Sequence, residues 1–126
     1  MSETIRRSWL LVPMSKADQI AQAPQSGADV IVLDLVELVA DEDKYAARKK
    51  VQAAIDTLQG GGAEVFAQID PELLYADLHA CVWPGLSGVV VSRAESSRQI
   101  EDADALLSRL EHVRGLLPGT VKIVAA

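Results

Sequence analysis

The chain has little of what marks several classes of protein. Cys81 is its one cysteine, which excludes an internal disulfide framework and predicts a reducing, cytoplasmic location. Lysine and arginine number 12 against 18 acidic residues, and the net charge of −6 argues against nucleic acid as a partner. No run approaches the roughly 20 apolar residues of a membrane span, and Pro13 ends the first run too early for a signal-peptide core. We therefore expect neither a nucleic-acid partner nor a membrane segment.

What the chain does have is a series of short apolar runs. The most informative is residues 30–35, which is nearly continuous and carries one carboxylate, Asp34, close to its end. Strands that are covered on both faces have this pattern, and such strands belong to parallel sheets wrapped by helices. The predicted strands are residues 8–12, 30–35, 65–69, 88–91 and 121–125.

Helical patterns fill the gaps between these strands. Ser15 with Asp18, and Ser96 with Gln99, have the spacing of a capping box, and Asp41 is the expected N-cap of the second helix. The predicted helices cover residues 15–24, 41–58, 72–82 and 96–115. Four strand–helix units and a final strand predict right-handed parallel crossovers within a single α/β domain over residues 1–126.

Two architectures fit this order of elements. One is an open, doubly wound sheet of the flavodoxin type, which would be complete at this length. The other is the first half of a TIM (β/α)8 barrel, which normally needs about 250 residues. The number of strands does not separate them.

Polar side chains follow each of the first four predicted strands. Because parallel strands end at one edge of a sheet, these side chains would gather at a common mouth. Carboxylates, an amide and cations there could bind a small anionic substrate together with a divalent metal such as Mg²⁺. The alternative is that they are ordinary loop residues, with Asp70 as an N-cap before Pro71. The candidates are Lys16, Asp34, Glu37, Gln68, Asp70, Arg93 and Glu95.

Three segments carry a resemblance to a known family. Residues 7–13 (R-S-W-L-L-V-P) resemble R-S-x-L-F-V-P-G, the usual opening of the HpcH/HpaI aldolase and citrate lyase β-subunit family. Residues 26–35 (S-G-A-D-V-I-V-L-D-L) resemble its S-G-A-D-x-x-I-L-D-L-E-D-A-V, and residues 85–96 resemble G-L-D-G-I-V-L-P-K-V-E-S. The matches keep the family's order and spacing over nearly the whole chain, which favours the half barrel.

The resemblance implies a function. Members are Mg²⁺-dependent carbon–carbon lyases or aldolases, many acting on CoA thioesters such as citryl-CoA or malyl-CoA, others on 2-keto-hydroxy acids. They commonly form homo-oligomers. It implies catalytic roles for Asp34 and Glu37. It also implies that the family's two metal-binding carboxylates lie beyond Ala126, so no metal ligand is assigned here and we expect the natural chain to continue. Substrate-binding roles fall to Lys16, Gln68, Asp70, Arg93 and Glu95.

The departures from the family pattern suggest a second reading. An arginine that holds the substrate carboxylate in the family is replaced by Gln68, which has no charge, and one of two carboxylates after the second strand is lost at Val36. A catalytically impaired relative that binds a ligand or a partner subunit would also fit. Other departures are Met14 for glycine, Lys16 for arginine, Glu37 for aspartate, Asp70 for asparagine and Arg93 for lysine.

Overall fold

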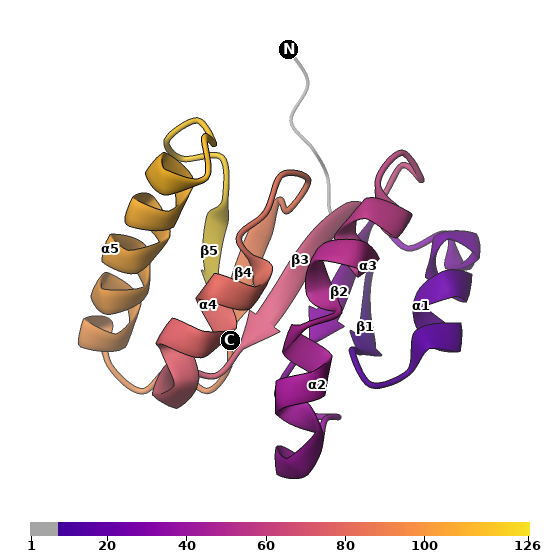
Figure 1. The fold of residues 1–126 in the computed structure, drawn as a ribbon, viewed down its shortest axis with the longest axis horizontal. Helices are drawn as coiled ribbons and strands as arrows, with labels where there is room; N and C mark the ends of the chain where they lie inside the picture. Colours follow the sequence, from indigo (N-terminus) through magenta and orange to yellow (C-terminus); the bar gives the residue numbers. More distant parts are fainter. Residues whose placement is uncertain (1–7) are drawn as a thin grey trace.

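The protein is built on a five-stranded parallel sheet in which neighbours along the chain are neighbours in the sheet (Figure 1). The computed structural model describes residues 8–126; Arg7, the first residue of the family-like opening, lies outside the described residues. All four strand pairs are parallel, as predicted from the apolar runs. The strands are β1 (Trp9–Pro13), β2 (Val30–Asp34), β3 (Glu64–Ile69), β4 (Gly88–Val91) and β5 (Lys122–Ala125).

Helices connect the strands in the predicted places. The helix expected over residues 41–58 is interrupted, because the N–H of Lys50 bonds the carbonyl of Ala47, a tighter turn than the α-helix makes. The helical segments are α1 (Ala17–Gln22), η1 (Ala23–Ser26), η2 (Asp41–Asp43), α2 (Lys44–Arg48), α3 (Val51–Leu58), η3 (Pro71–Leu73), α4 (Leu74–Cys81) and α5 (Ser97–Val113).

One of the predicted capping arrangements forms and two do not. Ser96 Oγ accepts the N–H of Gln99, which confirms Ser96 as the N-cap of α5. The Gln99 side chain accepts the N–H of Glu95 at 2.7 Å, one residue before the N–H that a capping box uses. The predictions for Ser15 and Asp41 were wrong. Lys16, not Ser15, directly precedes α1, and Asp41 lies inside the first turn of η2, where its charge favours the helix dipole without a capping bond.

The strand order distinguishes the two architectures. A doubly wound sheet reverses its order part way and carries helices on both faces. Here the order is sequential, and the buried residues of the helices join one core on one face of the sheet. Strand residues in that core include Leu33, Val65, Ala67 and Val89, which meet Val51, Ile55, Leu78, Ala103 and Leu107 from the helices. This is the arrangement of consecutive βα units in part of a barrel.

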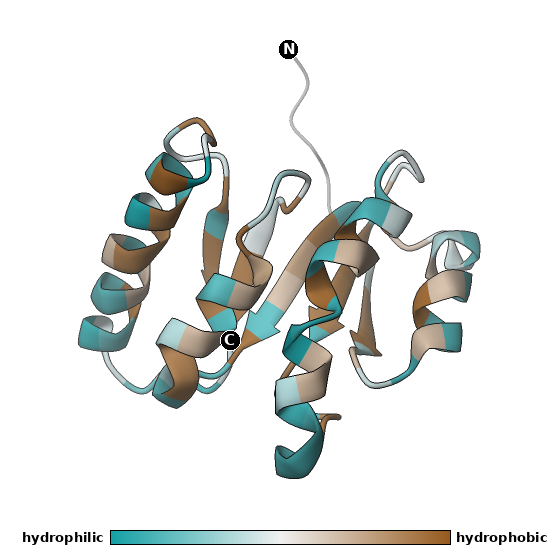
Figure 2. Cartoon of the chain, viewed as in Figure 1, coloured by the Kyte–Doolittle hydropathy of each residue, from teal (hydrophilic) through white to brown (hydrophobic). Residues whose placement is uncertain are grey.

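The opposite face of the sheet has a smaller apolar cluster formed by strand residues alone. Val30, Val32, Phe66 and Val90 are buried there, with Leu11 packed against them. Gly88 is required on this face, because a Cβ at that position would lie 2.4 Å from the Phe66 ring. Apolar residues run along the strands and alternate with polar ones along α5 (Figure 2), as expected for a buried sheet beneath an amphipathic helix.

None of the helices in the described part of the chain is long and apolar enough to cross a lipid bilayer.

Candidate functional site

The candidate residues gather at the carboxyl edge of the sheet. Asp34 at the end of β2 is in register with Pro13 on β1 and with Gln68 on β3, and Gln68 is in register with Val90 on β4. Arg93 follows β4 by two residues, so it lies at the same edge. The structure therefore brings together the strand ends that the sequence predicted to form one mouth. We call the groups at this edge the rim.

Asp34 shapes the loop that follows β2. Its side chain is fully buried, and its two oxygens accept the backbone N–H groups of Val36, Glu37 and Leu38 at 2.9, 3.0 and 2.6 Å. These bonds fix the backbone of the loop from which the Glu37 side chain extends. The catalytic role assigned to Asp34 stays a prediction; in this structure its carboxylate organises the loop.

Glu37 reaches across the end of β3 to the loop after β4. Its Oε1 accepts the hydroxyl of Ser92 at 2.8 Å, and Nε of Arg93 lies 3.6 Å from the same oxygen. Ser92 is buried, whereas the side chains of Glu37 and Arg93 are 42% and 74% exposed. An acid and a cation therefore lie side by side at the rim and open to solvent.

Arg93 adopts an unusual backbone conformation. Its φ is +51°, and it is the only non-glycine residue in the described range with a positive φ. A long side chain occupies the left-handed region only when its surroundings hold it there, and such residues concentrate at functional sites. This supports a functional interpretation of the loop after β4.

Asp70 is anchored by a network that the sequence did not reveal. Its side chain accepts the N–H of Glu72 at 2.9 Å, which confirms the N-cap alternative. Its own N–H donates to Asp77, a buried carboxylate on α4 that also accepts Nε of Arg48 at 2.8 Å. Burial raises the pKa of Asp77, and the bonds from Asp70 and Arg48 partly offset this. Lys44 lies 4.0 Å from the Asp70 carboxylate.

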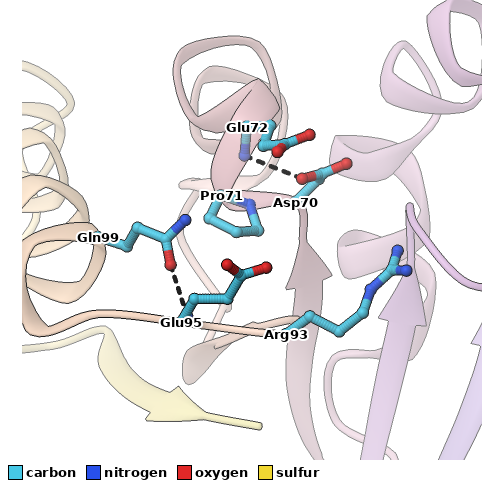
Figure 3. Close-up of a pocket in the computed structure, with 6 residues that line it drawn as sticks. All are labelled: Asp70, Pro71, Glu72, Arg93, Glu95 and Gln99. Carbon is cyan, nitrogen blue, oxygen red and sulfur yellow. Dashed lines mark hydrogen bonds between the residues drawn. The ribbon is translucent and has the colours of Figure 1, made fainter.

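Glu95 and Asp70 line a small polar cavity of about 150 Å³ between the loops after β3 and β4 (Figure 3). The Glu95 carboxylate points toward Pro71, and the Arg93 side chain extends away from Glu95 (Figure 3). Both loops thus supply polar groups to the rim. The lining residues are Asp70, Pro71, Glu72, Arg93, Glu95 and Gln99.

The remaining candidates lie at the ends of β1 and β3. Lys16 is exposed immediately after the turn that follows β1. Gln68 is half-buried and lines an apolar groove on the open face of the sheet, together with Val32, Val90 and others. Met14, which stands where the family pattern has glycine, has its side chain buried in the helix-side core and not at the mouth.

The described residues do not by themselves fit a magnesium ion. Between residues 8 and 126, no group of three or more His, Cys, Asp or Glu side chains could hold a metal. Two of the rim carboxylates are already engaged, since Asp34 binds three backbone N–H groups and Asp70 caps η3. We therefore assign no chemical step to a metal held by these residues.

Comparison with known proteins identifies the family. The model of the HpcH/HpaI aldolase/citrate lyase family matches residues 7–126. Citrate lyase subunit beta of Haemophilus influenzae is 30% identical over 125 residues, which are 97% of this chain and 43% of that protein. The L-malyl-CoA/beta-methylmalyl-CoA lyase of Cereibacter sphaeroides is 29% identical and matches 86% of this chain and 36% of its own length. The chain thus spans less than half the length of these relatives.

Solved structures agree on the fold. A magnesium/glyoxylate complex of Haloferax volcanii malate synthase has a TM-score of 0.82 over 95% of this chain and 42% of its own, at 16% identity, which is evidence for the fold alone. Protein CitE of Mycobacterium tuberculosis, in complex with magnesium and acetoacetate, is 29% identical with a TM-score of 0.61, over 77% of this chain and 40% of that one. With its sequential parallel sheet and its polar rim, this chain belongs to the HpcH/HpaI aldolase/citrate lyase family.

Proposed function

We propose that residues 1–126 form the first part of the barrel domain of a carbon–carbon lyase that cleaves a hydroxyacyl-CoA thioester of the citryl or malyl type. The names of the curated relatives support this substrate class. The single observation that carries the proposal is the contact between two rim loops, which brings the Glu37 carboxylate and the Arg93 guanidinium together at the carboxyl edge of the sheet.

These two side chains suit the two ends of such a substrate. The Arg93 guanidinium can bind the free carboxylate of the substrate with two parallel hydrogen bonds. Glu37 can accept the proton of the substrate hydroxyl as the carbon–carbon bond breaks, which leaves a carbonyl product and the enolate of the thioester; the enolate then takes up a proton. Gln68, between them on β3, can donate a hydrogen bond from its amide.

Magnesium dependence is part of the proposal for the whole protein. It is supported by the relative that was solved with magnesium and acetoacetate. In the whole protein, Arg93 would bind the substrate carboxylate and Glu37 would accept the proton of the substrate hydroxyl. Homo-oligomeric assembly and a cytoplasmic location stay predictions.

The direct experiment is an assay for Mg²⁺-dependent release of acetyl-CoA from malyl-CoA and citryl-CoA by the natural polypeptide that contains this chain. Loss of a positioned acid–base group typically costs 10²–10⁴-fold, so we expect Glu37→Gln to lower kcat by about 100-fold. The control is Glu101→Gln, an exposed glutamate on α5. Absence of turnover by folded protein on either substrate would contradict the proposal.

A second function is favoured by Gln68, which has no charge where the family pattern has arginine. A relative that binds dicarboxylates without cleaving them would explain this replacement. The two functions are separated by measuring dicarboxylate binding beside turnover. Binding without turnover supports the second function, and binding with turnover supports the first.

A further inference from the structure

Ser92 is a buried residue of the rim that the sequence predictions did not include. It is 3% exposed and follows directly after β4. Its N–H donates to the carbonyl of Ile69 at 2.9 Å, which ties it to the end of β3. Its hydroxyl donates to Oε1 of Glu37, 55 residues earlier in the chain. Ser92 thus links the loop after β2 to the ends of β3 and β4.

The backbone at Arg93 lets two consecutive side chains approach one carboxylate. In an extended strand, residues 92 and 93 would point to opposite faces of the sheet. The positive φ of Arg93 breaks this alternation, and the hydroxyl of Ser92 and the Nε of Arg93 both lie near the same oxygen of Glu37.

Ser92 is the partner that holds this oxygen. The Ser92–Glu37 distance of 2.8 Å is that of a good hydrogen bond, whereas 3.6 Å from Arg93 Nε is too long for one. The three bonds from Asp34 fix only the backbone of residues 36–38, so they leave the Glu37 side chain to be held by Ser92. Without the hydroxyl, the loose Glu37–Arg93 ion pair at 3.6 Å would be free to close to hydrogen-bond distance.

We infer that Ser92 is a positioning residue: its hydroxyl keeps the Glu37 carboxylate in a loose ion pair with Arg93, short of hydrogen-bond distance, so that the guanidinium keeps its donors for a carboxylate-bearing ligand. The inference rests on the proposed function, because it describes how the same rim keeps its acid and its cation separately usable. A closer, hydrogen-bonded Glu37–Arg93 pair would engage the guanidinium donors that the ligand needs and would occupy the base.

The test is binding of malonate, a simple dicarboxylate, measured by calorimetry on the natural polypeptide. We expect Ser92→Ala to weaken binding about fivefold, on the order of 1 kcal/mol, because Glu37 then competes for Arg93. Ser92→Thr keeps the hydroxyl and should restore binding. In a Glu37→Gln background, Ser92→Ala should change malonate affinity by less than about twofold.

The matched control is Ser87→Ala, at the opposite end of the same strand, which should bind malonate as the wild type does. Three results would overturn the inference: no malonate binding by the wild type, wild-type affinity in Ser92→Ala, or an undiminished loss in the Glu37→Gln background. A merely structural role for Ser92 would give the last of these. If the binding pattern is found but no thioester is cleaved, the proposed function fails and the positioning role stands.

Discussion

At both ends of the sheet, buried carboxylates hold loops by accepting hydrogen bonds from backbone N–H groups, but the loops at the two ends differ in what they expose. At the amino end, the buried carboxylate of Glu111 accepts the N–H groups of Gly119 and Val121 at 3.2 and 2.9 Å, and so holds the connection between α5 and β5. At the carboxyl end, Asp34 and Asp77 hold loops in the same way. At this end, the loops also bring an exposed acid and an exposed cation together, at Glu37 and Arg93.

This difference assigns stability to the amino end of the sheet and ligand binding to the rim at the carboxyl end. Glu111 and its loop can be disturbed without touching a ligand at the rim. Conversely, the exposed charges of the rim can be changed at little cost in folding, because surface ion pairs contribute about 0–1 kcal/mol. In barrel enzymes generally, the amino end of the strands contributes to stability and the carboxyl end carries the active site.

The largest expected effect is the loss of the buried anchor at the carboxyl end. Asp77→Ala removes the acceptor for Arg48 and for the Asp70 N–H. Removing one partner of a buried ion pair leaves the other charge uncompensated. We therefore expect Asp77→Ala to lower the unfolding free energy by about 3 kcal/mol, measured by urea denaturation. Asp104→Ala, an exposed aspartate on α5, is the control and should cost a few tenths at most. Equal losses in the two variants would show that the network does not hold the loop.

The second prediction addresses the two ends directly. Glu111→Gln keeps the size of the side chain but replaces one of its two accepting oxygens with an NH2 group, which cannot accept a hydrogen bond. One of the two backbone N–H groups therefore loses its partner, and the unfolding free energy should fall by about 1–2 kcal/mol. Malonate affinity should not change. Glu37→Gln should change the malonate affinity and leave the unfolding free energy nearly unchanged. If both variants changed both quantities, the division between the ends would be wrong.

The third prediction concerns pH. Burial raises the pKa of Asp77 above its ordinary value of 3.8, so the folded protein binds this proton more tightly than the unfolded chain. The contribution of Asp77 to the unfolding free energy therefore falls as pH rises from 3.8 through the folded-state pKa of Asp77. The unfolding free energy of the wild type minus that of Asp77→Asn, followed by urea denaturation upward from that pH, should show this decline. A difference that rises with pH would show that Arg48 outweighs burial.

The smallest expected effect is an increase in malonate affinity. Gln68→Arg places a guanidinium at the end of β3, beside the groove on the open face. Malonate affinity should increase about threefold, or roughly 0.7 kcal/mol, as judged by calorimetry. Gln52→Arg on the exposed surface of α3 adds the same charge away from the rim and should have no effect. Unchanged or weaker binding in Gln68→Arg would contradict the placement of Gln68 in the site.

The sequence predicted the strands well because each apolar run is a local signal. Residues 30–35 are continuous in apolarity, and β2 is buried along its whole length. It did not predict the break between α2 and α3, since Lys49 and Lys50 are good helix formers.

The site was predictable only in part. That Asp34, Gln68 and Arg93 lie at one edge follows from parallel strands. The bonds Ser92–Glu37 and Arg48–Asp77 join residues 55 and 29 positions apart, and no local pattern links such residues. Ser92 was also hidden by the resemblance, because the family pattern has proline at that position.

The most direct test of the rim as the functional end is an NMR titration of the natural polypeptide with malonate. The amide signals that move should be those of Glu37, Gln68, Ser92 and Arg93, at the carboxyl edge of the sheet. Amides of the opposite loops, such as those of Gly119 and Val121, should stay in place. Shifts confined to the amino-end loops, or none at saturating malonate, would contradict the account.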